Sequence, residues 1–335
     1  MNQASPPVFV ITSPRSGTTW LLRALNTHPE IFATELRAFG EYVDIVQDAG
    51  AAAPRLRITL DRYVDALLTS HQWEPLGGSR AVVRDDLVRT IYRSLRDHAL
   101  SRANRRVFLD KLTPYFGTAT TAVDAIARLF PQAKVILLVR DGRDVAVSGV
   151  MHWLTKDRAD RRPTPHQVER RASVLQQTHT MTRFFSDDEV TEWALTWRQP
   201  IDAVMAHNDT IDCLVVRYES MLTHLDHELR RLFAFLEVGI PDGIVEACVA
   251  GSTFEVMSGG RRRGDDLPGA HVRKGVVGDW HQYFTHRDAA LFNELAGDVL
   301  IDWGYEPDDT WAAQPPQACR STDTCCRQPG DDDGS

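Results

Sequence analysis

One stretch near the start of this 335-residue chain decides its fold, Val8-Phe9-Val10-Ile11-Thr12-Ser13-Pro14-Arg15-Ser16-Gly17-Thr18-Thr19-Trp20. Its first four residues are apolar and uncharged, which predicts a buried strand. Ser13 and Pro14 break that strand, and from Trp20 apolar residues recur at helical spacing until Pro29. The stretch therefore predicts a strand, a tight loop and a helix that begins where the loop ends.

The loop between strand and helix has the composition of an anion site. Backbone N–H groups at a helix N-terminus are unpaired, and the helix dipole favours negative charge. Gly17 lets the backbone approach a ligand closely, and Arg15 supplies a guanidinium that can fork onto an oxyanion. Ser16, Thr18 and Thr19 add hydroxyl donors.

Two other interpretations of the loop stay open from its residues alone. Small polar residues are common in ordinary strand–turn–helix connections with a helix cap. A nucleotide hydrolase of the P-loop type needs Gly-x-x-x-x-Gly-Lys-Ser/Thr. Here the first Gly is absent and Arg15 stands near the place of that Lys. The loop therefore suits a phosphate-like group better than a magnesium–ATP complex.

Bulk composition narrows the class of protein. The chain is 43% hydrophobic and 25% charged, as expected of a globular protein. Its net charge of −8 argues against a general nucleic-acid binder. We see no apolar run of membrane-spanning length and no leader segment, so we expect a cytoplasmic protein without an anchor. Five cysteines, three of them in the polar tail, predict neither a disulfide framework nor a zinc site.

The remaining pattern alternates strands and helices. Apolar runs at 107–109, 135–139 and 213–216 predict further strands, with a helix between Thr118 and Pro131. Strand, helix and strand in this order form a right-handed unit with parallel strands. We expect a single α/β domain over residues 1–310, with a central parallel β-sheet flanked by helices. Helical insertions are expected at about 41–101 and 153–190, and a disordered tail at 311–335.

A second basic segment follows the strand at 135–139. Residues 140–148 read Arg-Asp-Gly-Arg-Asp-Val-Ala-Val-Ser. Ligands bind at the carboxyl ends of parallel strands, so Arg140 and Ser148 can converge on one anion. The alternative is that Arg140 pairs with Asp141 or Asp144, and that Ser148 is only a small residue at a packed contact.

A third basic segment lies at 272–280 and reads Val-Arg-Lys-Gly-Val-Val-Gly-Asp-Trp. The chain has only four Lys against 34 Arg, so a Lys within a motif points to a need for its compact charge. Arg273 and Lys274 therefore become candidates for anion binding, the alternative being a solvated basic loop.

The three segments together resemble sulfotransferases that use 3′-phosphoadenosine-5′-phosphosulfate (PAPS). Residues 13–20 are similar to the loop that binds the 5′-phosphosulfate, residues 140–148 to the 3′-phosphate motif, and residues 273–280 to the third signature of the family. The resemblance spans residues 8–285 and implies the sulfotransferase fold, with its P-loop-like strand–loop–helix.

The resemblance also implies a donor site. Arg15, Ser16, Gly17, Thr18 and Thr19 would hold the 5′ end of PAPS. The 3′-phosphate would be bound by Arg140, Ser148, Arg273, Lys274 and Gly275. Trp20 and Phe254 match positions that sandwich the adenine, and Tyr218 matches a position near it; core packing is the alternative for all three.

Catalysis in such a site rests on positioning and on cations, and we expect no metal. Arg15 belongs to this set, together with Lys111, which is the candidate for the cation near the bridging oxygen. The segment Lys111-Leu112-Thr113-Pro114 resembles the Lys-x-x-Pro of tyrosylprotein and heparan sulfotransferases.

The general base departs from the pattern of the small-molecule enzymes. Those enzymes place a His after the second strand, in Lys-Thr-His-x-Pro, and this chain has none there. Glu35, with Arg37, matches the Glu-x-Arg of tyrosylprotein sulfotransferases and is the candidate base; a surface ion pair is the alternative. His28 and His152 are weaker candidates.

The implied reaction moves a sulfuryl group from PAPS to a hydroxyl of a small-molecule, lipid or carbohydrate acceptor, releasing 3′-phosphoadenosine 5′-phosphate (PAP). A catalytically inactive nucleotide-binding regulator of the same fold is one alternative. A kinase or other phosphotransferase is another, for which we find no magnesium ligands. The sequence predicts neither the acceptor nor the oligomeric state.

Overall fold

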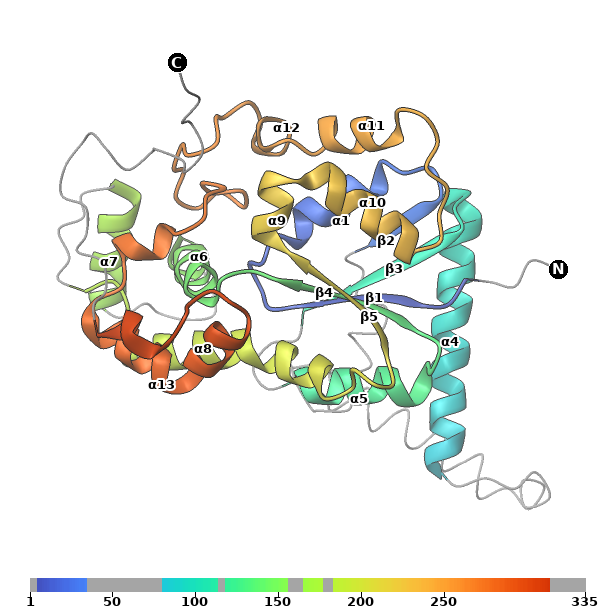
Figure 1. The fold of residues 1–335 in the computed structure, drawn as a ribbon, viewed down its shortest axis with the longest axis horizontal. Coiled ribbons are helices and arrows are strands. Elements are labelled where there is room, and N and C mark those ends of the chain that lie inside the picture. Colours follow the sequence, from blue (N-terminus) through green and yellow to red (C-terminus); the bar gives the residue numbers. More distant parts are fainter. Residues whose placement is uncertain (1–4, 35–79, 114–117, 156–164, 177–182, 314–335) are drawn as a thin grey trace.

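A computed structural model describes residues 5–34, 80–113, 118–155, 165–176 and 183–313. Its centre is a five-stranded sheet in the order β2-β3-β1-β4-β5, and all four pairs of neighbouring strands are parallel. The strands are β1 (Val8–Thr12), β2 (Ile31–Thr34), β3 (Val107–Leu112), β4 (Lys134–Val139) and β5 (Asp212–Arg217). Figure 1 shows them running toward the same side of the molecule, where α6 (Gly142–Thr155) begins. The predicted α/β fold with a central parallel sheet is confirmed.

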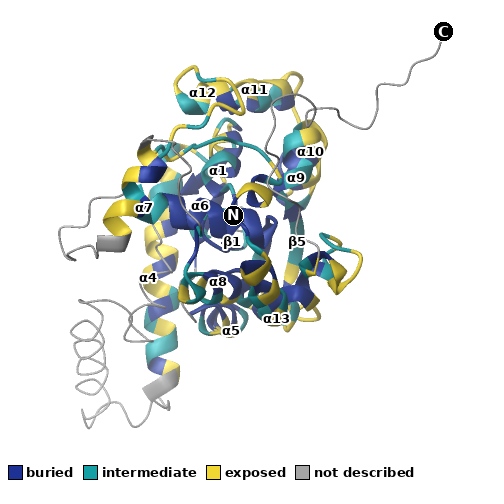
Figure 2. Cartoon of the chain, turned by 90° about the vertical axis from the view of Figure 1, so that its left-hand side faces the viewer, coloured by how far each residue is buried: buried dark blue, intermediate teal, exposed yellow. Residues whose placement is uncertain are grey.

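Helices cover both faces of the sheet (Figure 1). One face packs against α5 (Ala119–Leu129), α8 (Asp187–Met205) and α13 (His286–Asp302). The other packs against α1 (Thr18–Asn26), α10 (Leu225–Phe235) and α11 (Ile244–Ala250). The shorter helices α9 (Tyr218–Thr223) and α12 (Phe254–Ser258) lie near the carboxyl ends of the strands, and α7 (Pro165–Gln176) packs on α6. Because β1 and β4 are covered on both faces, their residues are almost all buried (Figure 2).

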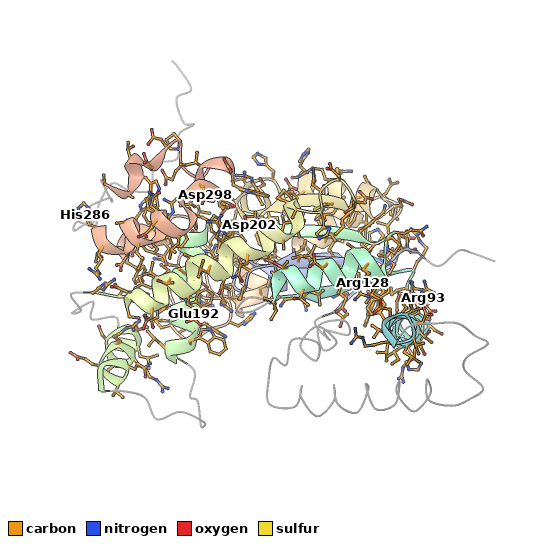
Figure 3. The ribbon with its side chains drawn as sticks, turned by 90° about the horizontal axis from the view of Figure 1, so that it is seen from below. Arg93, Arg128, Glu192, Asp202, His286 and Asp298 are labelled. Atoms are coloured by element: carbon orange, nitrogen blue, oxygen red, sulfur yellow. The ribbon has the colours of Figure 1, made fainter. Side chains whose placement is uncertain are left out.

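The helices on the first face separate apolar from charged positions. Trp193 and Trp197 of α8 are buried in the core. Figure 3 shows the opposite side of the same helices, where Glu192, Asp202 and Arg128 are exposed. Helix α13 begins at a capping box, in which Thr285 Oγ1 accepts from the Asp288 N–H and the Asp288 carboxylate accepts from the Thr285 N–H.

Three features differ from the sequence-based picture. Ile31–Thr34 forms the edge strand β2, paired with β3, although no strand was predicted there from the sequence. Helix α4 (Arg80–Ala103) falls largely within the predicted insertion at 41–101, yet it packs through Tyr92 onto Phe9 and Phe130 in the core. Trp311 is buried and contacts Trp280, because residues 309–312 form a 3₁₀ turn, so the predicted domain end at 310 is too early.

Some expectations lie outside the described residues. They include Glu35 and Arg37, the part of the predicted helical insertion that precedes residue 80, and nearly all of the predicted tail. Within the described residues, no helix is both long enough and apolar enough to cross a membrane.

Candidate active site

The loop at the carboxyl end of β1 is tight and its backbone is strained. Arg15 and Gly17 both have positive φ, at 68° and 94°. A side chain at Gly17 would place its Cβ 2.5 Å from the Tyr218 ring, so only glycine fits. Gly17 also caps α1 without a side-chain hydrogen bond, which leaves this helix N-terminus without a competing side-chain acceptor.

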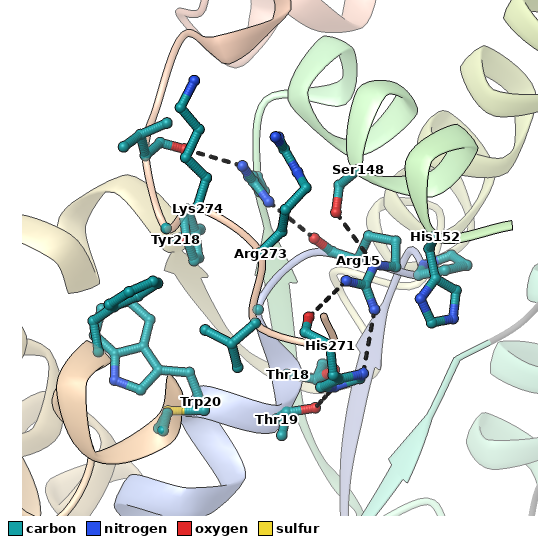
Figure 4. A pocket seen from close by; sticks show the side chains of 18 of the residues that line it. Arg15, Thr18, Thr19, Trp20, Ser148, His152, Tyr218, His271, Arg273 and Lys274 are labelled. Carbon is teal, nitrogen blue, oxygen red and sulfur yellow. Dashed lines mark hydrogen bonds between the residues drawn. The ribbon is translucent and has the colours of Figure 1, made fainter. Parts of the chain in front are cut away.

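A cavity of about 200 Å³ opens over this loop. Its walls come from segments far apart in the chain: the loop and α1, the end of β3, Arg140 with the second half of α6, and residues 271–276. Figure 4 shows these side chains converging from their separate elements. The predicted residues that line the cavity are Arg15, Gly17, Thr18, Thr19, Trp20, Lys111, Arg140, Ser148, Tyr218, Phe254, Arg273, Lys274 and Gly275.

Ser16 lies differently from the rest of its loop. Its side chain is fully buried, and its Oγ lies 2.7 Å from the Ser13 Oγ beneath the loop. The hydroxyl therefore stabilises the turn instead of facing the cavity, and Ser16 is not among the residues that line it.

Arg140 joins the three basic segments. Its guanidinium donates to the carbonyl of Arg15 at 3.2 Å and to the carbonyl of Val276 at 3.1 Å. It also stacks on Tyr218, with its Cζ 4.5 Å from the ring centroid. The sequence left open that Arg140 pairs with Asp141 or Asp144. Arg140 does form an ion pair with Asp144, at 3.7 Å, whereas Asp141 pairs with Arg143. Arg140 thus has a structural role and still lines the cavity.

Asp279 orders the third basic segment. Its carboxylate accepts from Arg273 and, at 2.7 Å, from Lys274. Burial acts to raise the pKa of Asp279, but Arg273 and Lys274 outweigh it and hold that pKa below its usual value. Arg273 also donates to Asp266 at 2.7 Å. Both cations are therefore held in place at the edge of the cavity.

Asp144 fastens the same segment to α6. Its carboxylate accepts from the backbone N–H of Gly278 at 2.9 Å and of Trp280 at 3.0 Å. Burial raises the pKa of Asp144 to about 6, although Arg140 and the two N–H groups act in the opposite direction.

Aromatic rings form another wall. Trp20 and Tyr218 meet edge to face with their centroids 5.7 Å apart. Phe254 packs against Gly275, where an added Cβ would lie 2.5 Å from the ring. Gly275 has φ 71°, so both its backbone and its neighbour require glycine.

Lys111 and Thr113 close the cavity from the end of β3. Lys111 stands opposite Val10 in the register with β1, next to the loop that carries Arg15.

The two weaker base candidates have different surroundings. His28 is buried outside the cavity, where its Nδ1 accepts from the Glu30 N–H and its Nε2 lies 2.8 Å from the Gly239 carbonyl. The hypothesis that His28 is the general base is therefore wrong, because both of its ring nitrogens contact backbone groups outside the cavity. His152 lines the cavity one turn beyond Ser148.

Several lining residues were not predicted from the sequence. Among them are Trp153, Ser252, Arg263 and His271. His271 is the most connected, because it contacts both Arg15 and Thr19. The sequence offered one sign that His271 belongs to the site, namely its position two residues before Arg273. Within the described residues, no group of three His, Cys, Asp or Glu side chains is arranged to hold a metal ion.

The fold and the cavity define an α/β protein in which a glycine-containing loop after β1 and two further basic segments meet in one cavity. A sequence profile described as the sulfotransferase family matches residues 6–242, which is most of the chain. The chain belongs to the sulfotransferase family. The profile includes the first two basic segments and ends before the third.

Individual relatives agree with this assignment. The nodulation protein NoeE of Sinorhizobium fredii is 28% identical over 308 residues, which are 89% of this chain and 65% of that protein. Protein-tyrosine sulfotransferase A of Caenorhabditis elegans is 23% identical over 73% of this chain and 53% of its own length. The chain thus spans less than two thirds of either relative.

A solved structure supports the fold. Mouse sulfotransferase SULT7A1 complexed with PAP superposes with a TM-score of 0.50 at 18% identity, covering 91% of this chain and 89% of that one. At this level of identity the likeness shows a shared fold.

Proposed function

We propose that the protein transfers a sulfuryl group from PAPS to a hydroxyl of a small-molecule, lipid or carbohydrate acceptor and releases PAP. One observation carries the proposal: a single cavity is lined by the anion loop of α1 and by the cationic set Arg140, Arg273 and Lys274. Two basic sites in one cavity suit a nucleotide that is anionic at both its 5′ and 3′ positions. The PAP complex of the mouse relative supports the same donor class.

Unpartnered buried donors support the fit of such a nucleotide. Trp20 Nε1, Arg140 Nε and Arg273 Nε are buried without a hydrogen-bond partner among the described residues, and all three side chains line the cavity. An unsatisfied buried donor costs free energy, which a ligand acceptor can recover. Arg140 and Arg273 would bind the 3′-phosphate, with Ser148 and Gly275 beside them.

The loop and the rings would hold the rest of the donor. The α1 N-terminus, Arg15 and Thr19 would bind the 5′ end, where negative charge is favoured. Trp20 and Phe254 would lie against the adenine, near Tyr218.

PAPS supplies an activated sulfuryl group attached to a phosphate leaving group. As the acceptor oxygen bonds to sulfur and the bond from sulfur to the bridging oxygen breaks, charge builds on the leaving phosphate. Lys111 and Arg15 would stabilise that charge from the cavity wall. Glu35 would take the proton of the acceptor hydroxyl, with His152 as the other candidate.

The test is sulfuryl transfer from ³⁵S-labelled PAPS to a panel of sugars, lipids and phenols. We expect labelled product and PAP in equal amounts, and a turnover at least about 100-fold lower in Glu35→Gln. If that variant keeps full turnover, Glu35 is not the base.

A nucleotide-binding regulator is the second candidate, and Thr113 in place of the usual His favours it. Tight binding of PAPS without transfer to any hydroxyl of the panel would support this candidate against the enzyme. Release of ADP from ATP would instead indicate a phosphotransferase.

A further inference from the structure

His271, from the segment 271–276, lies against the anion loop and contacts two of its residues, Arg15 and Thr19. Its Nε2 is 2.8 Å from the Thr19 Oγ1, and its Nδ1 is 3.5 Å from Arg15 Nη1. Its backbone carbonyl accepts from Arg15 Nη2 at 2.8 Å. Figure 4 shows the imidazole between Arg15 and Thr19, and all three residues line the cavity.

These contacts use the donors that a 5′ anion needs. A guanidinium donates only, so His271 must meet Arg15 with acceptors, through its carbonyl and its Nδ1. With Nδ1 as acceptor, the neutral ring carries its proton on Nε2 and faces the Thr19 hydroxyl. His271 thus offers the loop a neutral substitute for the oxygens of an anion.

The His271 ring can move away from Arg15 and Thr19 while residues 272–274 keep their backbone contacts. The carbonyls of Val272 and Arg273 accept from Arg261, and the carbonyl of Lys274 accepts from the Gly264 N–H at 2.9 Å. These bonds anchor the residues that follow His271, while His271 itself is exposed. A rotation of its side chain therefore leaves Arg273 and Lys274 in place.

We propose that His271 is an internal competitor for the anion loop, which the 5′-phosphate of a nucleotide must displace. The inference rests on the proposed function, because it takes the loop to be the 5′ site. Its consequence is selective: any ligand with a 5′-phosphate loses affinity to the competition, and a ligand with only a 3′-phosphate does not. The donor and the product PAP are affected alike, so His271 helps the product to leave.

Calorimetric titration of the full chain tests this inference with three nucleotides: PAP, adenosine 5′-monophosphate (AMP) and adenosine 3′-monophosphate. His271→Ala removes both ring contacts and is expected to bind PAP and AMP about five- to tenfold more tightly. Its affinity for adenosine 3′-monophosphate should stay within about twofold. His271→Gln, which can still reach Thr19, should lie between the wild type and His271→Ala.

A matched control is His227→Ala, which removes an exposed histidine of α10 that does not line the cavity. It should change none of the three affinities.

Two outcomes overturn the inference. If His271→Ala binds PAP and AMP more weakly, His271 is a ligand contact and not a competitor. If all three affinities stay unchanged, the ring has no part in binding. Failure of the proposed function looks different, because the wild type would then show no preference for PAP over either monophosphate.

Discussion

Asp144 connects the third basic segment to α6. It is fully buried in the first turn of α6, accepts from two N–H groups of residues 278–280 and lies 3.7 Å from Arg140. A buried carboxylate near one cation and two backbone donors is compensated only in part, as its raised pKa of about 6 indicates. The ionised form therefore fastens the segment at some cost to folding stability.

This cost has a defined pH dependence. Because the folded-state pKa of Asp144 is raised from 3.8 to about 6, the favourable contribution of its protonated form is complete below about pH 4 and is lost as the pH rises through 6. We expect the free energy of unfolding of the wild type, minus that of Asp144→Asn, to fall by about 2 kcal/mol between pH 4 and pH 7. Urea unfolding at several pH values measures this difference. A difference that rises with pH would show that Arg140 and the amides overcome the effect of burial.

Lys111 tests the chemistry apart from nucleotide binding. A cation near the bridging oxygen acts mainly when charge develops there, so Lys111→Ala should lower kcat about 100-fold while the affinity for PAP changes by less than about threefold. Steady-state kinetics together with calorimetry separates the two effects.

Lys134→Ala is the matched control. Lys134 is a β4 lysine outside the cavity and pairs with Glu237 at 2.6 Å. Its kcat should be unchanged. If Lys111→Ala loses affinity and rate equally, Lys111 binds the donor in its ground state and has no special role in the transition state.

At the scale of elements, α6 depends on glycine for its position. It meets α8 at Gly142 and Gly149, where an added Cβ would lie 2.3 Å from Trp197 and 2.1 Å from Trp193. The Trp197 Nε1 also donates to the Arg140 carbonyl at 2.8 Å. This close contact sets where Ser148 and His152 enter the cavity, since both belong to α6.

Gly149→Ala should therefore act on both stability and binding. The methyl group cannot be accommodated between α6 and Trp193 without a shift, and we expect a loss of about 2–4 kcal/mol in the free energy of unfolding. PAP affinity should fall as well, because Ser148 is the neighbouring residue.

Gly239→Ala is the control, since its nearest neighbour is the end of the Glu30 side chain at 3.4 Å. It should be close to neutral in thermal unfolding and in calorimetry. Equal stability of Gly149→Ala and the wild type would mean that α6 and α8 have room to separate.

For the whole molecule, the features that could be predicted from the sequence are those encoded by neighbouring residues in the chain. Apolar runs identify β1, β3, β4 and β5, and basic residues directly after β1 and β4 identify the loop and Arg140. Those residues meet because the carboxyl ends of parallel strands share one edge of the sheet.

Contacts between distant segments could not be predicted in this way. His271 contacts Arg15, which lies 256 positions earlier in the chain. Strand β2 has only four residues, and it is its pairing with β3 that makes this short segment a strand. The role of Ser16 was missed because a hydroxyl in an anion loop carries no sign of which side of the loop it faces. Trp311 was predicted to lie in the polar tail because its neighbours in sequence are polar, whereas its contact with Trp280 belongs to the core.

The central claim is that one cavity binds both phosphates of a 3′,5′-bisphosphorylated adenosine, and calorimetry of PAP against AMP tests it most directly. We predict that the wild type binds PAP at least about 100-fold more tightly than AMP, because in the proposed site Arg140, Arg273 and Lys274 would contact only the 3′-phosphate, which AMP lacks. In Arg273→Ala most of that preference should be lost, with little change for AMP. Equal affinity of the wild type for PAP and AMP would contradict the claim.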